Sequence, residues 1–271
     1  MIKFFRKIRQ RLLTENKFRN YMLYAIGEIL LVVIGILIAL QVNNWNERKN
    51  EQEKIKKFAM SLVQDLENDV KMVDTIQYVA NQIALRIDSL SHYIRDKEIN
   101  EISNLELVCL SWMKLYRPYS WNRVTLDELK NSGSLQLIKN NELSKKIVEY
   151  DAFTVHMDDD YNEDNIQSNN AWQLISEVVN VNYPNITELR EAIRYSATYG
   201  TMEDLFTSPE YMEVKTYGLE LNRKDKKALI SAVNSYIRLQ FNIEIRTEIE
   251  LPRLVADAKE LISLLNKEYR E

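Results

Sequence analysis

Residues 55–94 read IKKFAMSLVQDLENDVKMVDTIQYVANQIALRIDSLSHYI, and the spacing of their apolar side chains decides the fold class. Eleven steps between successive apolar positions cover 39 residues, a mean of about 3.5 residues per step. This is the period of a coiled coil, so the segment predicts a long helix packed against neighbouring helices. The apolar positions are Ile55, Ala59, Leu62, Leu66, Val70, Val73, Ile76, Ala80, Ile83, Ile87, Leu90 and Ile94.

Turn-forming residues are scarce throughout the chain. Only 5 of the 271 residues are glycine and 4 are proline, roughly a quarter to a third of ordinary usage. This scarcity argues against a β-sandwich, a barrel or a nucleotide-binding α/β fold, and it predicts an all-α protein. Neither residue type interrupts residues 41–117. We therefore expect the long helix to continue from upstream, to end near Asp96, and to be followed by a break at residues 100–104.

Shorter helices are expected to complete a helical bundle around the long one. A capping-box pattern begins at Thr125, for a short helix that Gly133 closes. Asn140 or Asn141 is expected to cap the next helix, and Ser208 followed by proline marks another helix start. The remaining helical segments are expected at residues 105–115, 143–161, 171–181, 187–197 and 224–269, the last with a bend at Pro252.

Upstream of the bundle lies the most apolar part of the chain, residues 21–42, which read YMLYAIGEILLVVIGILIALQV with Glu28 as the single charge. As a helix this stretch is about 33 Å long, enough to cross a hydrocarbon core of about 30 Å. A cleaved signal peptide is the alternative, but its apolar run is roughly 7–15 residues and ends at a small-residue cleavage site. We find no such site after Ala39, so we expect an uncleaved transmembrane helix at residues 21–42.

The charges on the two sides of this span indicate its orientation. Seven Lys and Arg residues precede the span, whereas five follow it closely among three glutamates: Arg48, Lys49, Lys54, Lys56 and Lys57. The positive-inside rule counts basic residues near the span ends, so it predicts a cytoplasmic segment at 1–20 and an extracytoplasmic helical domain at 43–271. Residues 43–271 as a whole carry 29 basic and 38 acidic residues. The acidic balance of the large domain argues against a nucleic-acid partner.

Five basic residues near the N-terminus alternate with apolar ones at near-helical spacing. This pattern is typical of a basic amphipathic helix on an anionic inner leaflet, although an ordinary positive flank that fixes topology explains the charges as well. The basic residues are Lys3, Arg6, Lys7, Arg9 and Arg11.

Two runs near the N-terminus carry a resemblance to a known family. FFRKIRQRLLTENKF at 4–18 and YAIGEILLVVIGILIALQVNNWNE at 24–47 resemble the signature of a family of uncharacterised single-span bacterial envelope proteins. A weaker likeness lies at 125–138, TLDELKNSGSLQLI, and the rest of the chain matches loosely. The resemblance implies a helical extracytoplasmic domain and no known activity. With the span and its basic flank, it implies a bacterial inner membrane protein with a periplasmic C-terminal domain.

Glu28 is the sharpest candidate functional residue because ionised side chains inside a bilayer are costly. Its spacing to Gly35 and Ala39 places all three on one stripe of the helix, and the two small residues would let a second helix approach closely. The stripe therefore predicts a contact with another helix or an ion-coupled carboxylate. The alternative is a carboxylate near the inner headgroups, with the span shifted outward. Residues 29–42 alone are too short to span, which limits that shift.

Other residues that could carry chemistry have simpler explanations. The acidic run from His156 to Asp164 imitates the first half of a calcium loop, but it lacks the glycine and the final glutamate, so we expect a solvated acidic loop. Cys109 is expected to be a small buried hydrophobe and His92 a surface residue. Trp112, Trp121 and Trp172 are expected to pack in the core rather than line a ligand cleft.

The sequence contains no motif of a known catalytic class. It has no phosphate-binding glycine loop, nucleophile elbow, HExxH or CxxC. We therefore expect no enzyme, no cofactor and no metal. The leading interpretation is a membrane-anchored interaction or scaffold protein that forms a homo-oligomer or binds another membrane protein. The alternatives are a subunit of an ion-driven envelope machine that uses the intramembrane carboxylate, and a sensing domain that acts through a partner.

Overall fold

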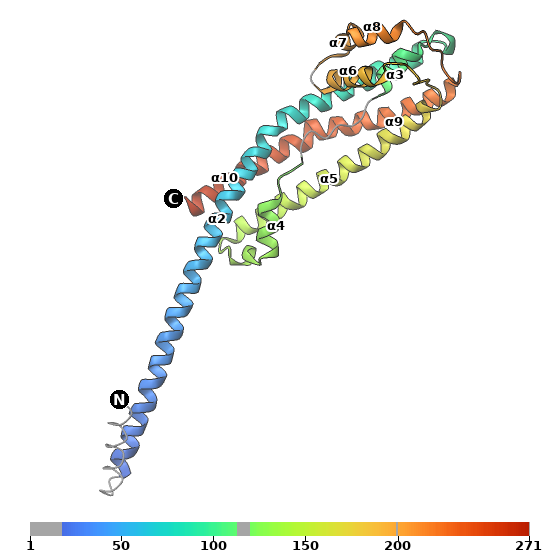
Figure 1. Cartoon of the computed structure of the whole chain (residues 1–271). Helices are drawn as coiled ribbons and strands as arrows, with labels where there is room; N and C mark the ends of the chain where they lie inside the picture. The colour runs from blue at the N-terminus through green and yellow to red at the C-terminus, as the bar shows by residue number, and fades with distance from the viewer. Residues whose placement is uncertain (1–17, 113–119, 199, 271) are drawn as a thin grey trace. The chain divides into compact units, whose positions relative to one another are not determined.

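The computed structural model describes residues 18–112, 120–198 and 200–270 (Figure 1). Helices make up 84% of this part of the chain, and it contains no β-strand. The predicted all-α class is therefore confirmed. The chain divides into two compact units, Met1–Lys57 and Phe58–Glu271.

Helix α2, Phe18–Asp96, has 79 residues and ends where the sequence predicts. The twelve apolar positions of its repeat are buried except Val70 and Ala80, which are half-buried. The neighbouring residue Asp69 is buried, and hydrogen bonds to its carboxylate offset the cost of burying a charge. It accepts hydrogen bonds from the Tyr150 hydroxyl at 3.1 Å and from the backbone N–H of Asn122 at 3.2 Å. The Lys226 ammonium donates to the carbonyls of Ile94 and Lys97, at the C-terminal end of α2.

Two short elements follow α2. The 3₁₀ turn η1, Ile99–Glu101, occupies the expected break, and Ser103 caps helix α3, Asn104–Ser111, by accepting from the Glu106 N–H. Nearly every side chain of α3 is buried, Cys109 among them. The helix ends at Ser111, earlier than the predicted segment 105–115, whose residues 113–115 lie outside the described residues.

Helix α4, Val124–Asn131, begins two residues earlier than the predicted capping box requires. The prediction that Thr125 caps this helix is wrong, because Thr125 lies inside its first turn. The Thr125 hydroxyl donates to the Asp65 carboxylate of α2 at 2.5 Å instead. Gly133 follows the helix in the left-handed conformation, with φ 68°, as a closing glycine should, and η2, Ser134–Leu137, comes next.

Helix α5, Asn141–Ser176, is a single helix of 36 residues with Asn140 as its cap. Two predictions are corrected here. The acidic run at 156–164 is not a loop but part of this helix, and no separate helix begins at residue 171. The residues expected to share its inner face are all buried: Leu143, Ile147, Tyr150, Phe153, Met157 and Tyr161.

Three short helices form one end of the fold. Helix α6 is Ile186–Thr198, α7 is Met202–Phe206 and α8 is Pro209–Lys215. Ser208 caps α8 and proline occupies its first turn, as the sequence predicts. Thr201 caps α7 with Asp204 completing a capping box.

The C-terminal part of the chain is helical throughout. Helix α9, Lys226–Ile245, leads into the π-helix η3, Arg246–Glu250, and then into α10, Leu251–Tyr269. In the π turn the Leu251 N–H bonds the Arg246 carbonyl, five residues back. The next bond of this kind would join the Thr247 carbonyl to Pro252, which has no N–H. The Gln77 side-chain amide donates to that carbonyl at 3.0 Å and replaces the missing bond.

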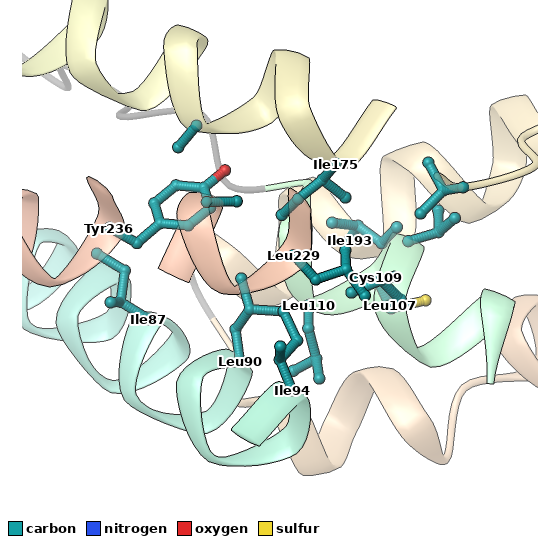
Figure 2. Close-up of a cluster of buried hydrophobic side chains, with 14 of the residues drawn as sticks. Ile87, Leu90, Ile94, Leu107, Cys109, Leu110, Ile175, Ile193, Leu229 and Tyr236 are labelled. Atoms are coloured by element: carbon teal, nitrogen blue, oxygen red, sulfur yellow. The ribbon is translucent and has the colours of Figure 1, made fainter. Parts of the chain in front are cut away.

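One large apolar cluster is built from α2, α3, α5, α6 and α9, with α8 adding to it. Figure 2 shows Ile87, Leu90 and Ile94 of α2 facing Leu229 and Tyr236 of α9, close to Leu107, Cys109 and Leu110 of α3. Ile175 and Ile193 close the cluster from α5 and α6.

Candidate functional site

The N-terminal part of α2 carries a stretch of exposed apolar side chains. Its most apolar 18-residue window has a mean hydropathy of 2.6, and none of it is buried. Among the described residues this is the one helix long and apolar enough to cross a membrane. Large exposed apolar surfaces are rare on soluble monomers, whereas lipid covers such a surface without loss.

Glu28, Gly35 and Ala39 all lie on this stretch of α2. Separations of seven and four residues keep them within about one helix stripe at 3.6 residues per turn. Glu28 is half-buried, and Gly35 and Ala39 are exposed. A Cβ built at Gly35 would meet no other atom within 4 Å, so none of the described residues packs against that part of the helix. The basic residues Lys3, Arg6, Lys7, Arg9 and Arg11 lie outside the described residues.

A second candidate site is a cluster of charged side chains between α5 and the π turn. Arg246 Nη1 lies 2.7 Å from Glu250 Oε1 and 3.1 Å from Asp160 Oδ2, and Arg246 Nε lies 3.4 Å from Asp164 Oδ2. Asn242 donates to the second Asp164 oxygen at 2.8 Å. The Asp164 side chain is 1% exposed and that of Arg246 is 10% exposed. These contacts join α5 to the junction of α9, η3 and α10.

Burial and pairing act in opposite directions on these groups. Burial raises the pKa of Asp164, although the Asn242 amide and the Arg246 guanidinium oppose it. Burial alone would lower the pKa of Arg246, but the carboxylates of Asp164, Glu250 and Asp160 outweigh it and raise that pKa. Arg246 therefore stays charged and holds the carboxylates in place.

His156 brings a third kind of side chain to the cluster. Its Nε2 lies 3.1 Å from Asp160 and 4.0 Å from Glu250, and one ligand atom of each of the three residues lies within 4.8 Å of the others. A divalent cation accepts such a ligand set. Here the Arg246 guanidinium sits against both carboxylates, so it already supplies the positive charge that an ion would bring. We assign the cluster a structural role.

Sequence reasoning missed this cluster, although the sequence contains its signal. His156, Asp160 and Asp164 recur every four residues, and Arg246 and Glu250 do the same. Both sets therefore mark helix faces. Asp159 and Glu163, which lie between these residues, are exposed. The acidic segment 156–164 therefore resembles a solvated loop when its residues are not separated by helix face. The partner Arg246 lies 82 residues away from Asp164 in the chain, and local patterns cannot reveal such a pairing.

The remaining candidates lie where the sequence predicts. Cys109 is a free cysteine that is 1% exposed. His92 is exposed on α2 between two aspartates. Trp121 is buried, while Trp112 and Trp172 are half-buried and contact each other with ring centroids 6.2 Å apart.

Comparison with known proteins gives a family match over part of the chain and no activity. Residues 28–110 match a family of unknown function, DUF6090, which agrees with the resemblance to an uncharacterised family. The matched segment covers most of the apolar stretch, the rest of α2 and nearly all of α3. No solved structure matches the chain.

One curated protein is similar to part of the chain, the ribosome maturation factor RimP of Mesoplasma florum. The two are 28% identical over 107 residues, which cover 36% of this chain and 65% of that protein. This chain therefore spans less than two thirds of its curated relative, and the relative's name describes that protein alone.

Proposed function

We propose that this protein is a single-span membrane-anchored scaffold that assembles with a second copy of itself, or with another membrane protein, through its span. The observation that carries the proposal is the uncovered apolar stretch of α2 with Glu28, Gly35 and Ala39 on one stripe. We further propose that the protein has no catalytic chemistry of its own, because no known catalytic motif occurs in its sequence.

The physical reason for assembly is shared by the three residues. Small side chains permit close backbone contact between helices, which increases van der Waals packing in lipid. Placing an ionised side chain at the bilayer centre costs about 2.5–3.5 kcal/mol on the insertion scale, and a partner helix reduces that cost. A carboxylate on the same stripe as the small residues would therefore face the partner rather than lipid.

The proposed location is the bacterial inner membrane, with residues 1–20 inside and the helical domain in the periplasm. The basic flank supports this orientation through the positive-inside rule. Five basic residues lie close after the span, fewer than the seven before it, which agrees with this orientation.

Cysteine crosslinking in native membranes tests the assembly. Cys109 is first replaced by alanine, a mild change at a small buried side chain, so that each variant carries one cysteine. Gly35→Cys and Ala39→Cys place that cysteine on the stripe. Leu30→Cys and Leu37→Cys are matched controls, because a shift of two residues turns the position by about 200° around the helix. We expect crosslinked dimers, or adducts with one membrane protein, from the first pair only. Equal crosslinking from both pairs, or none from either, would contradict the proposal.

A second function is favoured by one observation, the single carboxylate of the apolar stretch. If Glu28 couples ion movement, Glu28→Gln should preserve crosslinking at Gly35 but reproduce the phenotype that deletion of the gene produces. If Glu28 only holds helices together, glutamine should preserve both crosslinking and cellular function, because it still forms hydrogen bonds across the helix contact. The two outcomes separate an ion-driven envelope machine from a scaffold.

A further inference from the structure

Arg86 of α2 is a buried cation that no carboxylate of the described residues neutralises. The residue is 3% exposed, and its Nη2 donates to the Ser196 hydroxyl of α6 at 2.8 Å. That hydroxyl in turn donates to the Ile193 carbonyl at 3.0 Å. The other terminal nitrogen, Nη1, has no hydrogen-bond partner among the described residues, and no carboxylate of those residues forms an ion pair with Arg86.

Buried guanidinium groups normally have a carboxylate partner, because removing an unpaired charge from water costs several kcal/mol. Burial lowers the pKa of Arg86 to about 10, so the group still carries its charge at neutral pH. The nearby thiol of Cys109 cannot supply the opposite charge, since burial raises its pKa to about 12. No carboxylate of the described residues pairs with Arg86, so a bound ligand is the expected source of the counter-ion.

Arg86 is part of the wall of a pocket of about 330 Å³ between α2 and the start of α7. This volume lies at the small end of the range for ligand sites. Apolar contacts come from Leu85 and Met202, and amide or hydroxyl groups come from Gln82, Ser89 and Thr201. The two carboxylates of the wall, Asp88 and Glu203, belong to exposed residues. The pocket thus combines one buried cation with two exposed anions.

We propose that this pocket binds a small free α-amino acid with an aliphatic side chain. Its carboxylate pairs with the unpartnered, enclosed Nη1 of Arg86, which the ligand reaches by a small shift of the pocket wall, and its ammonium group pairs with Asp88 and Glu203. Leu85 and Met202 contact the aliphatic side chain. A ligand with both charges complements the buried cation and the two exposed carboxylates of the wall together, whereas one with only an ammonium would leave Arg86 uncompensated. This inference concerns the helical domain alone and does not depend on assembly through the span.

Thermal unfolding and calorimetric titration of the full chain in detergent test the proposal with three probes. L-leucine carries both charges, 4-methylvalerate lacks the ammonium group, and isoamylamine lacks the carboxylate. A ligand that binds only the folded state raises the melting temperature. We expect a rise with millimolar L-leucine, at least tenfold weaker binding of 4-methylvalerate, and no binding of isoamylamine. No binding of L-leucine, or equal binding of L-leucine and 4-methylvalerate, overturns the proposal.

Variants then assign the binding to the pocket. Arg86→Met keeps the unbranched apolar stem and removes the charge, so we expect it to abolish the L-leucine effect and to melt no lower than the wild type without ligand. Arg95→Met is the matched control on the exposed side of α2 and should bind L-leucine normally. Asp88→Asn should weaken L-leucine binding and leave 4-methylvalerate binding unchanged. If Arg86→Met melts well below the wild type without ligand, or still binds L-leucine, Arg86 is a structural residue and the proposal fails.

Discussion

At the scale of single residues, the most constrained side chain is Arg246. Three carboxylates contact its guanidinium, those of Asp160 and Asp164 from α5 and of Glu250 from the π turn. The Asn242 amide of α9 donates to Asp164. Such a cluster does not by itself stabilise a fold more than apolar packing does. Removing its single guanidinium is different, because three carboxylates would then share a largely buried site without compensation.

We therefore expect Arg246→Met to destabilise the protein by about 3–5 kcal/mol. Chemical denaturation of the full chain in detergent, followed by circular dichroism, measures the change. Arg238→Met is the matched control, because Arg238 lies exposed on the same helical run and should change stability by less than about 0.5 kcal/mol. Equal effects of the two substitutions would show that the cluster has no structural role.

The same cluster predicts how the loss of stability in Arg246→Met depends on pH. Burial raises the pKa of Asp164, so the folded state binds this proton more tightly than the unfolded state. Stability from this group is therefore gained as pH falls through the folded pKa and lost as pH rises. Arg246→Met removes a group that opposes the shift, so that pKa rises further. We expect the loss of stability in the variant to shrink as the pH falls from neutral through the raised pKa of Asp164. A loss that is constant or grows on acidification would contradict this explanation.

At the scale of helices, the sequence predicts elements where local chemistry decides and fails where distant partners decide. Asn140, Ser208 and Gly133 cap or close helices as expected, because caps depend on neighbouring backbone groups. Thr125 does not, because Asp65 competes for its hydroxyl. Helix α5 was predicted to be interrupted by an acidic loop, yet Arg246 makes its inner acidic residues part of the packing. The candidate stripe on α2 comes from sequence alone, whereas the charged cluster and the Arg86 pocket need the tertiary structure.

The buried repeat of α2 makes a quantitative prediction. Leu90 is fully buried in the apolar cluster, whereas Leu85 on the same helix is 59% exposed. Leu90→Ala should cost about 2–5 kcal/mol, because the cavity cannot refill, and Leu85→Ala should cost far less. Denaturant titration of both variants measures the difference. Similar losses would mean that the repeat does not face the core.

The bond between Gln77 and the Thr247 carbonyl explains how the helical run tolerates Pro252. Gln77→Ala should destabilise the protein by about 0.5–1.5 kcal/mol, the usual value of one hydrogen bond. Pro252→Ala supplies a backbone N–H to the same region, so the loss from Gln77→Ala should be smaller in that background. A double-mutant cycle measures this coupling. Strict additivity of the two substitutions would show that Gln77 does not compensate for the proline.

At the scale of the whole molecule, the proposed membrane-anchored scaffold requires the apolar stretch of α2 in the bilayer and the helical domain in the periplasm. The apolar stretch of α2 suits a bilayer by length and composition. The helical domain of residues 58–271 contains the apolar cluster, the Arg246 cluster and the Arg86 pocket, and none of these includes a residue of Met1–Lys57. Anchoring and the proposed ligand binding can therefore be tested separately.

The measurement that tests the anchored topology most directly is a pair of reporter fusions placed after Glu271. One reporter is active only in an oxidising compartment outside the inner membrane, and the other only in the cytoplasm. A retained span with its N-terminus inside predicts activity from the first reporter, no activity from the second, and a membrane-bound product that still contains residues 1–42. Activity from the cytoplasmic reporter alone, or a mature chain that begins after Ala39, would contradict the proposed anchor.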